Sequence, residues 1–426
     1  MRGIIGENLT PAIAAEYGCA FGTFLKKRKP SGQVRVCVGR DSRPSGQMLE
    51  SAVTSGLCSV GVDVVEVGIV PTPTVGVMTM YLGCDGGVVL TASHNPIQYN
   101  GIKLLLDNGI APDADLAARI RDCYFDKDFQ FAASVDCGHI SYDAQADDVH
   151  IGKVLSLVDK DTIAAGNFKV VLDSVNGAGG NVGKKLLETL GCTVVAVNNE
   201  MTGFFAHTPE PTKENLVDLC GKITENNADV GFAQDPDADR LAIVDAGGNY
   251  IGEEYTLALC AKYVFSKKKG TAAANLSTSR MIDDVAEKAA CSVIRTAVGE
   301  ANVADAMVKN NCVIGGEGNG GIIDLRVSPV RDSLVGIALV LQLMAETGKS
   351  VAQLVEEIGG YYVDKSKIAI DKSTAAEIIE KAKAEFTDAK VDTTDGCRFD
   401  FEDGWVHLRT SNTEPVMRII VETRTP

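Results

Sequence analysis

Short apolar runs alternate with longer segments of helical periodicity along most of this 426-residue chain. The clearest runs lie at 34–38, 168–172 and 271–275. Each is followed by a small or polar turn and then by a helical pattern, at 46–60, 177–190 and 280–290. Strands that alternate with helices in this way are typical of α/β units around a parallel sheet. The sequence therefore predicts an α/β fold with three related domains, whose sheets are mixed and mostly parallel.

The last part of the chain has a different pattern. We expect a strand at 361–370 and a helix at 375–386, followed by short strands at 398–401, 404–408 and 416–422. Short strands joined by tight turns favour an antiparallel sheet, so this part is predicted to be a smaller α+β domain. Polar or glycine-rich residues near 143, 248 and 359 divide the chain into predicted domains at 1–143, 144–248, 249–359 and 360–426.

The charge balance narrows the classes of partner. Lys and Arg number 41 against 57 Asp and Glu, a formal net charge of −16. Nucleic acids and anionic membranes are bound by clustered cations, so we expect neither as a partner. The 12 cysteines include no C-x-x-C pair, and the first residues show no signal-peptide pattern. No apolar run reaches the ~18 residues of a membrane span. A cytoplasmic protein is therefore expected, and an anionic substrate fits only where a cation or an arginine cluster reverses the sign.

The segment T-A-S-H-N-P at 91–96 directly follows the apolar run at 87–90. A serine at the end of a buried strand is where an α/β protein exposes a nucleophile or a ligand, which makes Ser93 a candidate. An Asn-Pro turn with a capping serine is the alternative, and it is favoured on this segment alone. Adjacent residues on a strand point to opposite faces, so we expect a base for Ser93 to come from elsewhere than His94. No G-x-S-x-G motif surrounds Ser93, which disfavours a hydrolase.

The segment D-P-D-A-D-R at 235–240 follows the apolar run at 228–233. Asp235, Asp237 and Asp239 alternate along an extended loop and can converge on one side of it. Three hard oxygen ligands suit Mg²⁺, whereas a solvated acidic turn would leave three carboxylates repelling one another. An EF-hand is excluded because its glycine and its last glutamate are missing. Arg240, directly after the carboxylates, favours an anionic partner such as phosphate.

The segment G-E-G-N-G-G at 316–321 formally matches a dinucleotide-binding pattern, but a strand-like run follows at 322–325 instead of a helix. We therefore reject a dinucleotide site. Glu317 and Asn319 are suited to sugar hydroxyls, since a carboxylate accepts hydrogen bonds and an amide both donates and accepts them. A tight turn with a surface glutamate is the alternative, and this motif by itself would favour it.

The segment R-T-S-N-T-E-P at 409–415 lies between two expected strands of the last domain. An arginine beside hydroxyls, amides and free backbone N–H groups is suited to phosphate. An ordinary polar hairpin loop explains the same residues equally well.

In this order, the four motifs resemble those of the α-D-phosphohexomutase superfamily, which includes phosphoglucomutases, phosphomannomutases and phosphoglucosamine mutases. The resemblance covers essentially the whole chain, with further matches at 2–3, 39–43, 99–103, 209–211 and 214–216. It implies four domains around a central cleft, with one loop from each domain lining that cleft. It also implies that the last domain moves as a lid, and we expect a monomer or a homodimer.

The resemblance also implies a role for each matched residue. Ser93 would be the phosphoserine, and an oxygen of its phosphate would bind one Mg²⁺ together with Asp235, Asp237 and Asp239. Glu317 and Asn319 would contact the sugar, and Lys103 would shuttle a proton. The phosphate that is not transferred would be held by Arg409, Ser411, Asn412 and Thr413. Arg240 would be a catalytic residue that stabilises the charge on the transferred group, and Arg2, Arg40 and His94 would be supporting residues.

Two departures from the family pattern matter. Many members have G-E-x-S-G-H in the sugar loop, whereas here Asn319 replaces Ser and Gly321 replaces His. Any acid or base role of that His is absent, so more depends on Lys103. With V-G-E at 298–300, this loop looks most like the archaeal-type, phosphoglucosamine-mutase-like branch. In addition, the sequence begins at Met1-Arg2-Gly3, without most of the family's F-G-T-x-G-x-R-G opening.

The implied activity is a reversible shift of phosphate between O6 and O1 of a hexose, through a bound hexose 1,6-bisphosphate that also serves as activator. Glucosamine 6-phosphate, converted to glucosamine 1-phosphate, is the first choice of substrate, and mannose or glucose phosphate is the second. A hypothesis of a different class is a non-catalytic sugar-phosphate-binding protein that kept the fold. A serine-dependent phosphatase is disfavoured, because a closing cleft excludes the water it would need.

Overall fold

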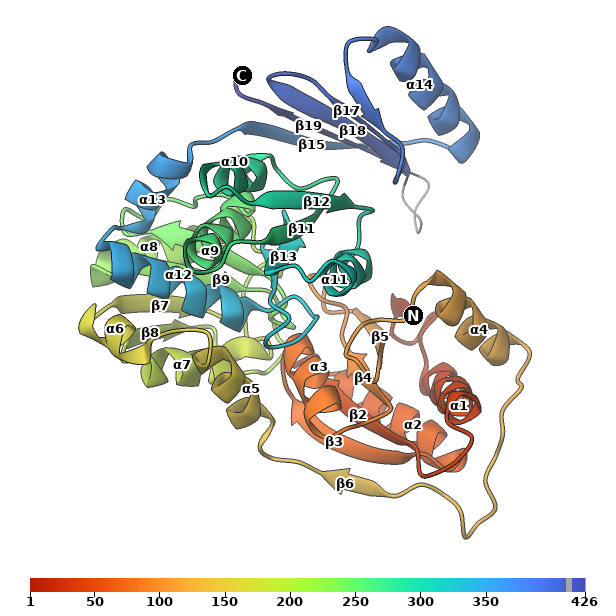
Figure 1. The fold of residues 1–426 in the computed structure, drawn as a ribbon. Helices are drawn as coiled ribbons and strands as arrows, with labels where there is room; N and C mark the ends of the chain where they lie inside the picture. Colours follow the sequence, from red (N-terminus) through yellow and green to blue (C-terminus); the bar gives the residue numbers. More distant parts are fainter. Residues whose placement is uncertain (411–415, 426) are drawn as a thin grey trace.

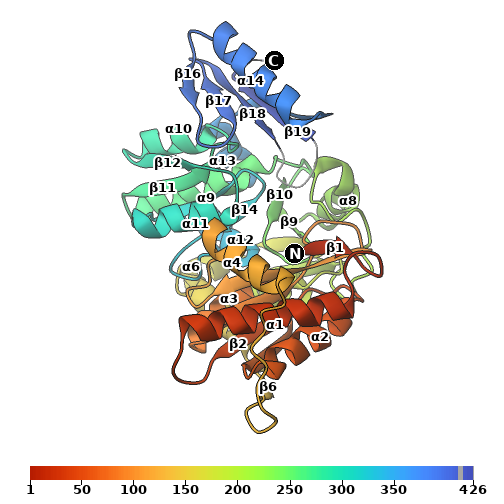
Figure 2. The same ribbon diagram turned by 90° about the vertical axis from the view of Figure 1, so that its right-hand side faces the viewer.

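The computed structural model describes residues 1–410 and 416–425, which form four β-sheets with helices packed on them (Figure 1). We call the parts built on these sheets the first, second, third and C-terminal units. The predicted fold class is confirmed: three α/β units with mixed, mostly parallel sheets precede a smaller unit with an antiparallel sheet. In the view turned by 90°, the C-terminal unit lies at one end of the molecule and the first unit at the other (Figure 2).

The first unit has a six-stranded sheet with the order β1-β5-β4-β2-β3-β6. Its strands are β1 (Arg2–Ile4), β2 (Arg35–Arg40), β3 (Asp63–Ile69), β4 (Gly86–Leu90), β5 (Tyr99–Leu106) and β6 (Ile140–Tyr142). Its helices are α1 (Pro11–Arg28), α2 (Gly46–Ser59), α3 (Thr72–Tyr81) and α4 (Ala114–Phe125).

The second unit has a four-stranded sheet with the order β10-β9-β7-β8. Its strands are β7 (Lys169–Asp173), β8 (Thr193–Val197), β9 (Val230–Gln234) and β10 (Leu241–Asp245). Its helices are α5 (Ala146–Leu155), α6 (Lys160–Ala165), α7 (Gly179–Thr189), α8 (Val217–Asn226) and the short 3₁₀ helix η1 (Lys213–Asn215).

The third unit has a four-stranded sheet with the order β12-β11-β13-β14. Its strands are β11 (Thr271–Asn275), β12 (Ser292–Thr296), β13 (Ile314–Glu317) and β14 (Gly321–Ile323). Its helices are α9 (Glu254–Lys267), α10 (Met281–Lys288), α11 (Glu300–Lys309), α12 (Ser333–Thr347) and α13 (Val351–Ile358). No single helix among the described residues is long and apolar enough to cross a membrane. Helices α12 and α13 pass that test only as a pair, and a 90° bend separates them.

The C-terminal unit has a five-stranded sheet with the order β15-β19-β18-β17-β16 and one helix. Its elements are β15 (Tyr362–Ala369), α14 (Lys372–Glu385), β16 (Lys390–Asp392), β17 (Cys397–Asp400), β18 (Gly404–Thr410) and β19 (Val416–Thr423). The predicted domain limits at 143, 248 and 359 fall in connections between elements, and they stay a prediction.

The first three sheets share one arrangement around the candidate site. In each, a central strand pairs in parallel with two neighbours: β2 with β3 and β4, β7 with β8 and β9, and β11 with β12 and β13. One of those neighbours then pairs antiparallel with the next strand, as β4 with β5, β9 with β10, and β13 with β14. The sequence motifs at 91–96, 235–240 and 316–321 all lie at this antiparallel connection. The structure therefore gives the three motifs equivalent places in three sheets.

Apolar packing joins the second and third units more closely than the rest. One cluster of buried side chains contains Leu172 and Ile243 from the second sheet, Leu257 and Leu341 from helices of the third unit, and Val77 from α3. Side chains of the C-terminal unit have a separate small core that contains Phe399 and Met417. The second and third units thus share a core, whereas the C-terminal unit has its own.

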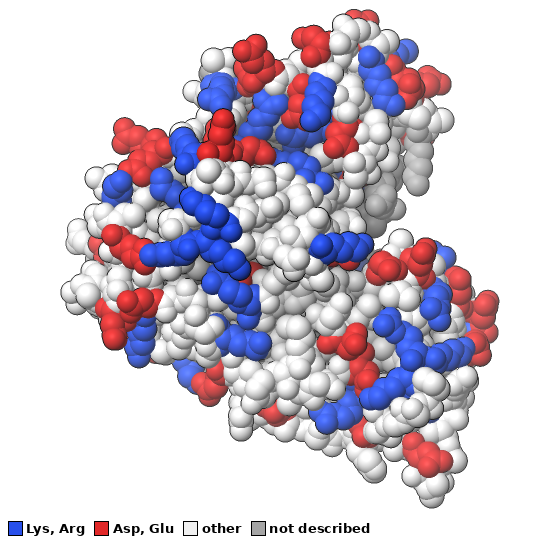
Figure 3. Space-filling model, viewed as in Figure 1, with Lys and Arg blue, Asp and Glu red and all other residues white. Residues whose placement is uncertain are grey.

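Several hydrogen bonds and ion pairs join the C-terminal unit to the third unit. Arg280 donates to Asp400 Oδ1 at 2.9 Å, and Ser277 Oγ lies 2.9 Å from His407 Nδ1. Lys365 on β15 donates to Glu253 Oε1 at 2.6 Å and to Glu254 Oε1 at 3.0 Å. On the face in Figure 3, positive and negative side chains are interspersed over all four units. The hydrogen bonds and ion pairs of Arg280, Ser277 and Lys365 position the C-terminal sheet on the third unit.

Helices α1 and α2 pack closely because small residues line their contact. A Cβ atom at Gly56 would lie 2.1 Å from the carbonyl oxygen of Ala15, and one at Gly18 would lie 2.5 Å from that of Val53. Neither glycine has a positive φ, so the close approach, and not the backbone conformation, requires glycine there.

We predict that Gly56→Ala lowers the free energy of unfolding by about 1–3 kcal/mol, because the added methyl group forces the two helices apart. A lower urea midpoint would show this. The matched control is Gly221→Ala in α8, where a Cβ meets no atom within 4 Å. That change is expected to stabilise by about 0.4–1 kcal/mol, because alanine restricts the unfolded chain. Equal effects of the two substitutions would contradict the prediction.

Candidate active site

The connections of the three sheets meet at one place. Ser93 Oγ, after β4, donates to Asp235 Oδ2, after β9, at 2.8 Å. Leu241 N donates to Gly320 O at 2.9 Å, which joins the end of the aspartate loop to the loop between β13 and β14. Side chains from sequence positions more than 200 residues apart therefore line a common site.

Arg43 holds the loop that carries Ser93. This side chain is 1% exposed, and its guanidinium donates to the carbonyl oxygens of Ser93 and Asn95, each at 2.6 Å. It also donates to the carbonyl oxygens of Pro96 at 2.7 Å and Tyr99 at 2.9 Å. A guanidinium is well suited to this task because its five N–H donors have a fixed planar geometry. One buried cation thus fixes the path of the backbone on both sides of Ser93.

Ser93 itself has a left-handed backbone, with φ at 49°. This conformation is uncommon for a residue with a side chain. It also ends the strand alternation, and Ser93 Oγ lies 3.3 Å from His94 Nδ1. The expectation that the two side chains point to opposite faces was therefore wrong, because alternation holds only within the strand. Burial and the nearby Arg240 lower the pKa of His94 to about 3, so its ring is neutral at physiological pH.

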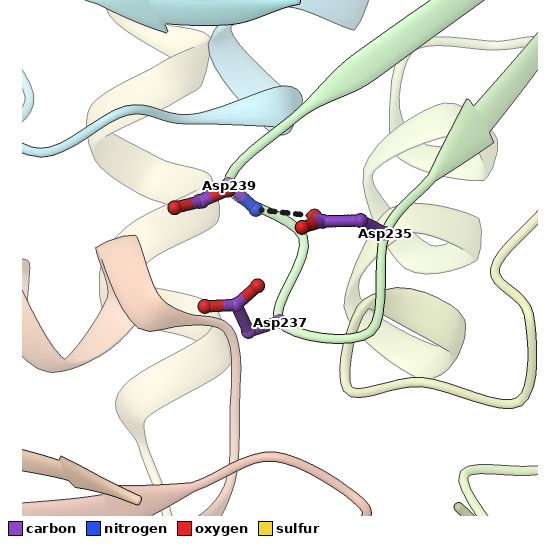
Figure 4. A group of neighbouring side chains, drawn as sticks. All are labelled: Asp235, Asp237 and Asp239. Atoms are coloured by element: carbon purple, nitrogen blue, oxygen red, sulfur yellow. Dashed lines mark hydrogen bonds between the residues drawn. The ribbon is translucent and has the colours of Figure 1, made fainter. Parts of the chain in front are cut away.

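Asp235, Asp237 and Asp239 leave one short loop between β9 and β10 (Figure 4). All three are buried, and each offers a carboxylate oxygen within 4.8 Å of those of the other two. Burial raises the pKa of Asp235 and of Asp237. The charges of Asp237 and Asp239 raise the pKa of Asp235 further, and the charge of Asp239 does so for Asp237. The pKa of Asp239 is lowered to about 2, because Arg331, Lys103 and Arg240 outweigh the effect of burial. The three carboxylates therefore repel one another, and the nearby cations offset this repulsion at Asp239.

The oxygen atoms of this loop fit a divalent cation. Asp235 Oδ1 accepts from the backbone N–H groups of Asp239 and Arg240, each at 3.1 Å. Asp237 Oδ2 accepts from Thr72 Oγ1 at 2.6 Å, and Asp239 Oδ2 accepts from Arg331. The other oxygens, Asp237 Oδ1 and Asp239 Oδ1, are buried without a hydrogen-bond partner. A buried acceptor without a partner is costly, and hard oxygen ligands of this kind suit Mg²⁺.

A cavity of about 930 Å³ opens in front of Ser93 and the aspartates; we call it the larger cavity. Although the protein is acidic overall, several cationic side chains line it, which are Arg2, Lys103, Arg240, Arg331 and Arg418. These side chains make the cavity locally positive, which is the condition that we expected for an anionic substrate. The larger cavity can therefore hold a group with several negative charges beside a nucleophilic hydroxyl.

Lys103 lies on β5 and its ammonium donates to Glu300 Oε1 at 2.9 Å. Burial alone would lower the pKa of Lys103, but Glu300 and Asp239 raise it above its ordinary value. In this arrangement Lys103 is a cation, and it can accept a proton only after the contact with Glu300 changes. The predicted proton-shuttling role stays a prediction.

A second cavity of about 300 Å³ lies next to the first and shares His94, Arg240 and Arg418 with it; we call it the smaller cavity. Glu317, Asn319 and Arg409 line it, together with Lys365 of the C-terminal unit. Here Asn319 Oδ1 accepts from the backbone N–H of Gly321 at 3.2 Å, and Arg409 pairs with Asp395 at 3.2 Å. Glu317 and Asn319, predicted to contact the sugar, thus line the same cavity as Arg409, predicted to contact phosphate.

Three predicted residues fall outside the described part of the chain, and one lies away from the two cavities. Ser411, Asn412 and Thr413 are not among the described residues. Arg40 is absent from the described linings of both cavities, and its Nε pairs with Glu50 Oε2 at 2.8 Å. The expectation that Arg40 lies at the transferred group therefore has no support in this arrangement.

Several residues at the site were missed by sequence reasoning: Thr72, Glu300, Arg331 and Arg418 had no assigned role, and Arg43 was only part of a motif match. Some of them act across a long sequence separation, as Thr72 does on Asp237, 165 residues away, and Arg331 on Asp239, 92 residues away. The only sequence signal for Glu300 was its place in the V-G-E segment.

Comparisons with known proteins agree with this geometry. Four profiles of one family, phosphoglucomutase/phosphomannomutase, match successive parts of the chain: domain I at 1–131, domain II at 148–248, domain III at 252–361 and the C-terminal domain at 368–426. The chain is 40% identical to a phosphoglucomutase/phosphomannomutase of Thermococcus kodakarensis, covering 100% of this chain and 93% of that protein. A probable phosphoglucosamine mutase of Methanopyrus kandleri is 36% identical, covering 99% of this chain and 92% of that protein.

A solved structure is similar over the same length. The phosphoglucomutase/phosphomannomutase family protein from Burkholderia thailandensis superimposes with a TM-score of 0.87 at 28% identity, covering 100% of this chain and 92% of that chain.

We predict that Arg43→Lys loosens the loop around Ser93, because one ammonium cannot reach all four carbonyl oxygens. Each buried acceptor left without a partner costs on the order of 1–3 kcal/mol. Hydrogen exchange measured by mass spectrometry should become faster in peptides that span 91–100. Arg121→Lys, at an exposed arginine paired with Asp122, is the control and should change nothing there. Unchanged protection in the Arg43 variant would argue against this role.

Proposed function

Because this chain belongs to the phosphoglucomutase/phosphomannomutase family, we propose that it shifts phosphate reversibly between O6 and O1 of a hexose, using Ser93 as the phosphorylated residue. The observation that carries this proposal is that Ser93, whose Oγ contacts Asp235, lines a cavity together with Asp237, Asp239 and several cationic side chains. A hydroxyl in that place can hold a phosphoryl group beside both the aspartate loop and the positive side chains.

We propose Asp235, Asp237 and Asp239 as the ligands of one Mg²⁺, on the strength of their convergent oxygens. When bound there, Mg²⁺ supplies positive charge to the phosphoryl group. The remaining charge is neutralised by cationic side chains of the larger cavity, which include Arg240, directly after the aspartate loop, and Lys103, whose charge helps to lower the pKa of Asp239. Phosphoryl transfer proceeds through a loose transition state, so positioning and charge neutralisation account for most of the catalysis.

The transfer itself requires little chemistry from the protein. The bond between phosphorus and Ser93 Oγ breaks, and a bond forms to the free hydroxyl of the hexose phosphate. The proton of that hydroxyl ends on Ser93 Oγ, and we retain Lys103 as the residue proposed to carry it. The product is a 1,6-bisphosphate, which turns over and returns its other phosphoryl group to Ser93. Both half-reactions then use the same nucleophile, aspartate loop and cations.

Exclusion of water favours transfer to a sugar over hydrolysis. Ser93 is 7% exposed, and Arg43 holds the loop that carries it by donating to the carbonyl oxygen of Ser93. A phosphoryl group in a water-poor site is transferred to the hydroxyl that is bound there. This supports a mutase rather than a serine-dependent phosphatase.

The smaller cavity supports the remaining part of the proposal, that the other end of the substrate lies between the third and C-terminal units. Arg409 would contact the phosphate that is not transferred, and we propose that Ser411, Asn412 and Thr413 join it. Glu317 and Asn319 would contact the sugar hydroxyls. The substrate of the proposed mutase reaction would bind in two orientations. The polar side chains of the smaller cavity would have to form hydrogen bonds with it in both, and flexible polar groups allow that.

Glucosamine 6-phosphate is the substrate we propose first. The support is the G-E-G-N-G-G loop and the similarity to the protein named a probable phosphoglucosamine mutase. Mannose and glucose phosphates are the second choice, supported by the more similar relative named phosphoglucomutase/phosphomannomutase. One amino group in place of one hydroxyl is a small difference for a binding site to read.

We predict that Ser93→Ala abolishes mutase turnover in the presence of Mg²⁺ and the matching hexose 1,6-bisphosphate. The variant has no hydroxyl to carry the phosphoryl group. Turnover is measured by coupled assay, and transfer of ³²P from the bisphosphate to the protein is measured in parallel. The control is Ser55→Ala, at an exposed serine that bonds only within its own helix. Wild-type turnover in the Ser93 variant would refute the phosphoserine.

A comparison of glucosamine, mannose and glucose 6-phosphates by kcat/KM tests the proposed substrate. We expect the value for glucosamine 6-phosphate to be the highest of the three. If one of the other two sugars gives the highest value, the assignment moves to that sugar and the proposed reaction stands. If no sugar supports turnover while the protein binds them, the chain is a sugar-phosphate-binding homologue.

A further inference from the structure

Arg331 is a largely enclosed cation to which neither the motifs nor the family resemblance assigned a role. It lies between β14 and α12, immediately before the N-cap residue Asp332, and its side chain is 12% exposed. It lines the larger cavity. A buried arginine at such a place needs partners that justify the loss of its hydration.

The partners of Arg331 are three carboxylates from three different elements. Its Nε donates to Glu300 Oε2 at 3.0 Å, and one terminal nitrogen donates to Glu317 Oε2 at 2.6 Å. The other terminal nitrogen donates to Asp239 Oδ2. The planar guanidinium suits this arrangement because its donors diverge at fixed angles, which an ammonium cannot reproduce. One side chain therefore joins the aspartate loop, the sugar loop and the partner of Lys103.

The contact with Asp239 decides which oxygen of that carboxylate faces the proposed metal position. Oδ2 is engaged by Arg331, whereas Oδ1 is buried without a partner. Thr72 does the same for Asp237, where it engages Oδ2 and leaves Oδ1 without a partner. Groups that orient metal ligands in this way commonly affect metal affinity nearly as much as the ligands do.

The contact with Glu317 completes the hydrogen bonding of a second carboxylate. Its Oε1 accepts from Asn275 Nδ2 at 2.7 Å and from the backbone N–H of Gly299 at 3.1 Å. Its Oε2 accepts from Arg331. Both oxygens are thus directed by the protein, and Glu317 is held in one orientation at the wall of the smaller cavity.

Gly321 provides the space that Arg331 occupies. A Cβ atom at Gly321 would lie 2.2 Å from Arg331 Cδ and 2.9 Å from Arg331 Cγ. The φ angle of Gly321 is not positive, so its backbone conformation is open to other residues. The side chain of Arg331 is therefore the reason for glycine at this position.

We propose that Arg331 is a positioning residue that orients Asp239 for the metal and Glu317 for the sugar, and that Gly321 is glycine in order to admit it. An arginine from the following loop fills the space that a side chain at position 321 would need. This inference rests on the proposed function for its account of Mg²⁺ and the sugar.

A role through charge alone makes the opposite prediction. If the positive charge of Arg331 merely repelled Mg²⁺, its removal would strengthen Mg²⁺ binding. If Arg331 orients Asp239, its loss or displacement weakens Mg²⁺ binding. The substitution Gly321→Ala separates the two, because it displaces the arginine side chain and leaves the net charge unchanged.

The experiment is a titration of the full chain with Mg²⁺ by isothermal calorimetry, without sugar. We expect Gly321→Ala to weaken Mg²⁺ binding by roughly 10-fold to 100-fold, the usual effect of losing a residue that orients a metal ligand. The control is Gly152→Ala in α5, where a Cβ meets no atom within 4 Å. That variant should bind Mg²⁺ as the wild type does.

Arg331→Lys and Arg331→Met complete the test. Lysine keeps the charge but cannot hold three carboxylates, so both variants should weaken Mg²⁺ binding to a similar degree. The double variant with Gly321→Ala and Arg331→Met should bind no more weakly than Arg331→Met alone, because the two changes remove one interaction. The matched control is Arg326→Lys, at a half-exposed arginine of the same connection that pairs with Asp324.

The outcomes separate this inference from the proposed function. Wild-type Mg²⁺ affinity in Gly321→Ala, or fully additive losses in the double variant, would overturn it. If Gly321→Ala does not fold, as judged by circular dichroism, the comparison of Arg331→Lys with wild type decides, and unchanged affinity in that variant would overturn the inference. Mg²⁺ binding requires no turnover, so a wild-type protein that is inactive on all three sugars would refute the proposed function alone.

Discussion

Three buried carboxylates in one short loop are the constraint on which the rest of this structure depends. Like charges at this spacing repel one another, and burial increases the cost. The surroundings offset that cost with backbone N–H groups, a threonine hydroxyl and cations that come from different sheets. Asp239 shows the balance most clearly, because Arg331, Lys103 and Arg240 keep it ionised although it is fully enclosed. The loop therefore has its native arrangement only when the three α/β units are assembled around it.

The repeated sheet plan explains how those units reach the same place. In each of the first three sheets, the connection to an antiparallel strand carries the motif, whether it supplies the hydroxyl of Ser93, the three carboxylates or Glu317 and Asn319. Ligands of open α/β sheets bind where the carboxyl ends of parallel strands leave the sheet. The three connections meet at one site, and each contributes chemically different groups to it. Arg43 holds the connection that carries Ser93, and Arg331 contacts the other two through Asp239 and Glu317.

Much of this arrangement is readable from the sequence, because it depends on local pattern. The helix predicted at 46–60 runs Gly46–Ser59, and the strand predicted at 271–275 runs Thr271–Asn275. The helix predicted at 375–386 begins earlier, at Lys372, because Asp371 caps it. Arg331 was missed because no periodicity or motif connects it with Asp239, 92 residues away. The side chain of His94 was misplaced because the left-handed backbone of Ser93 breaks the rule of alternation.

The apolar core shared by the second and third units fixes the distance between two parts of the candidate site. Sliding these units apart would expose that hydrocarbon to water, whereas the C-terminal sheet is attached by polar groups that water can replace. The distance from the aspartate loop to Glu317 is therefore set when the chain folds. Under the proposed mutase reaction, a hexose phosphate would have to fit that distance in both of its orientations, so the spacing that an acceptable sugar must match would be set by the folding of the second and third units.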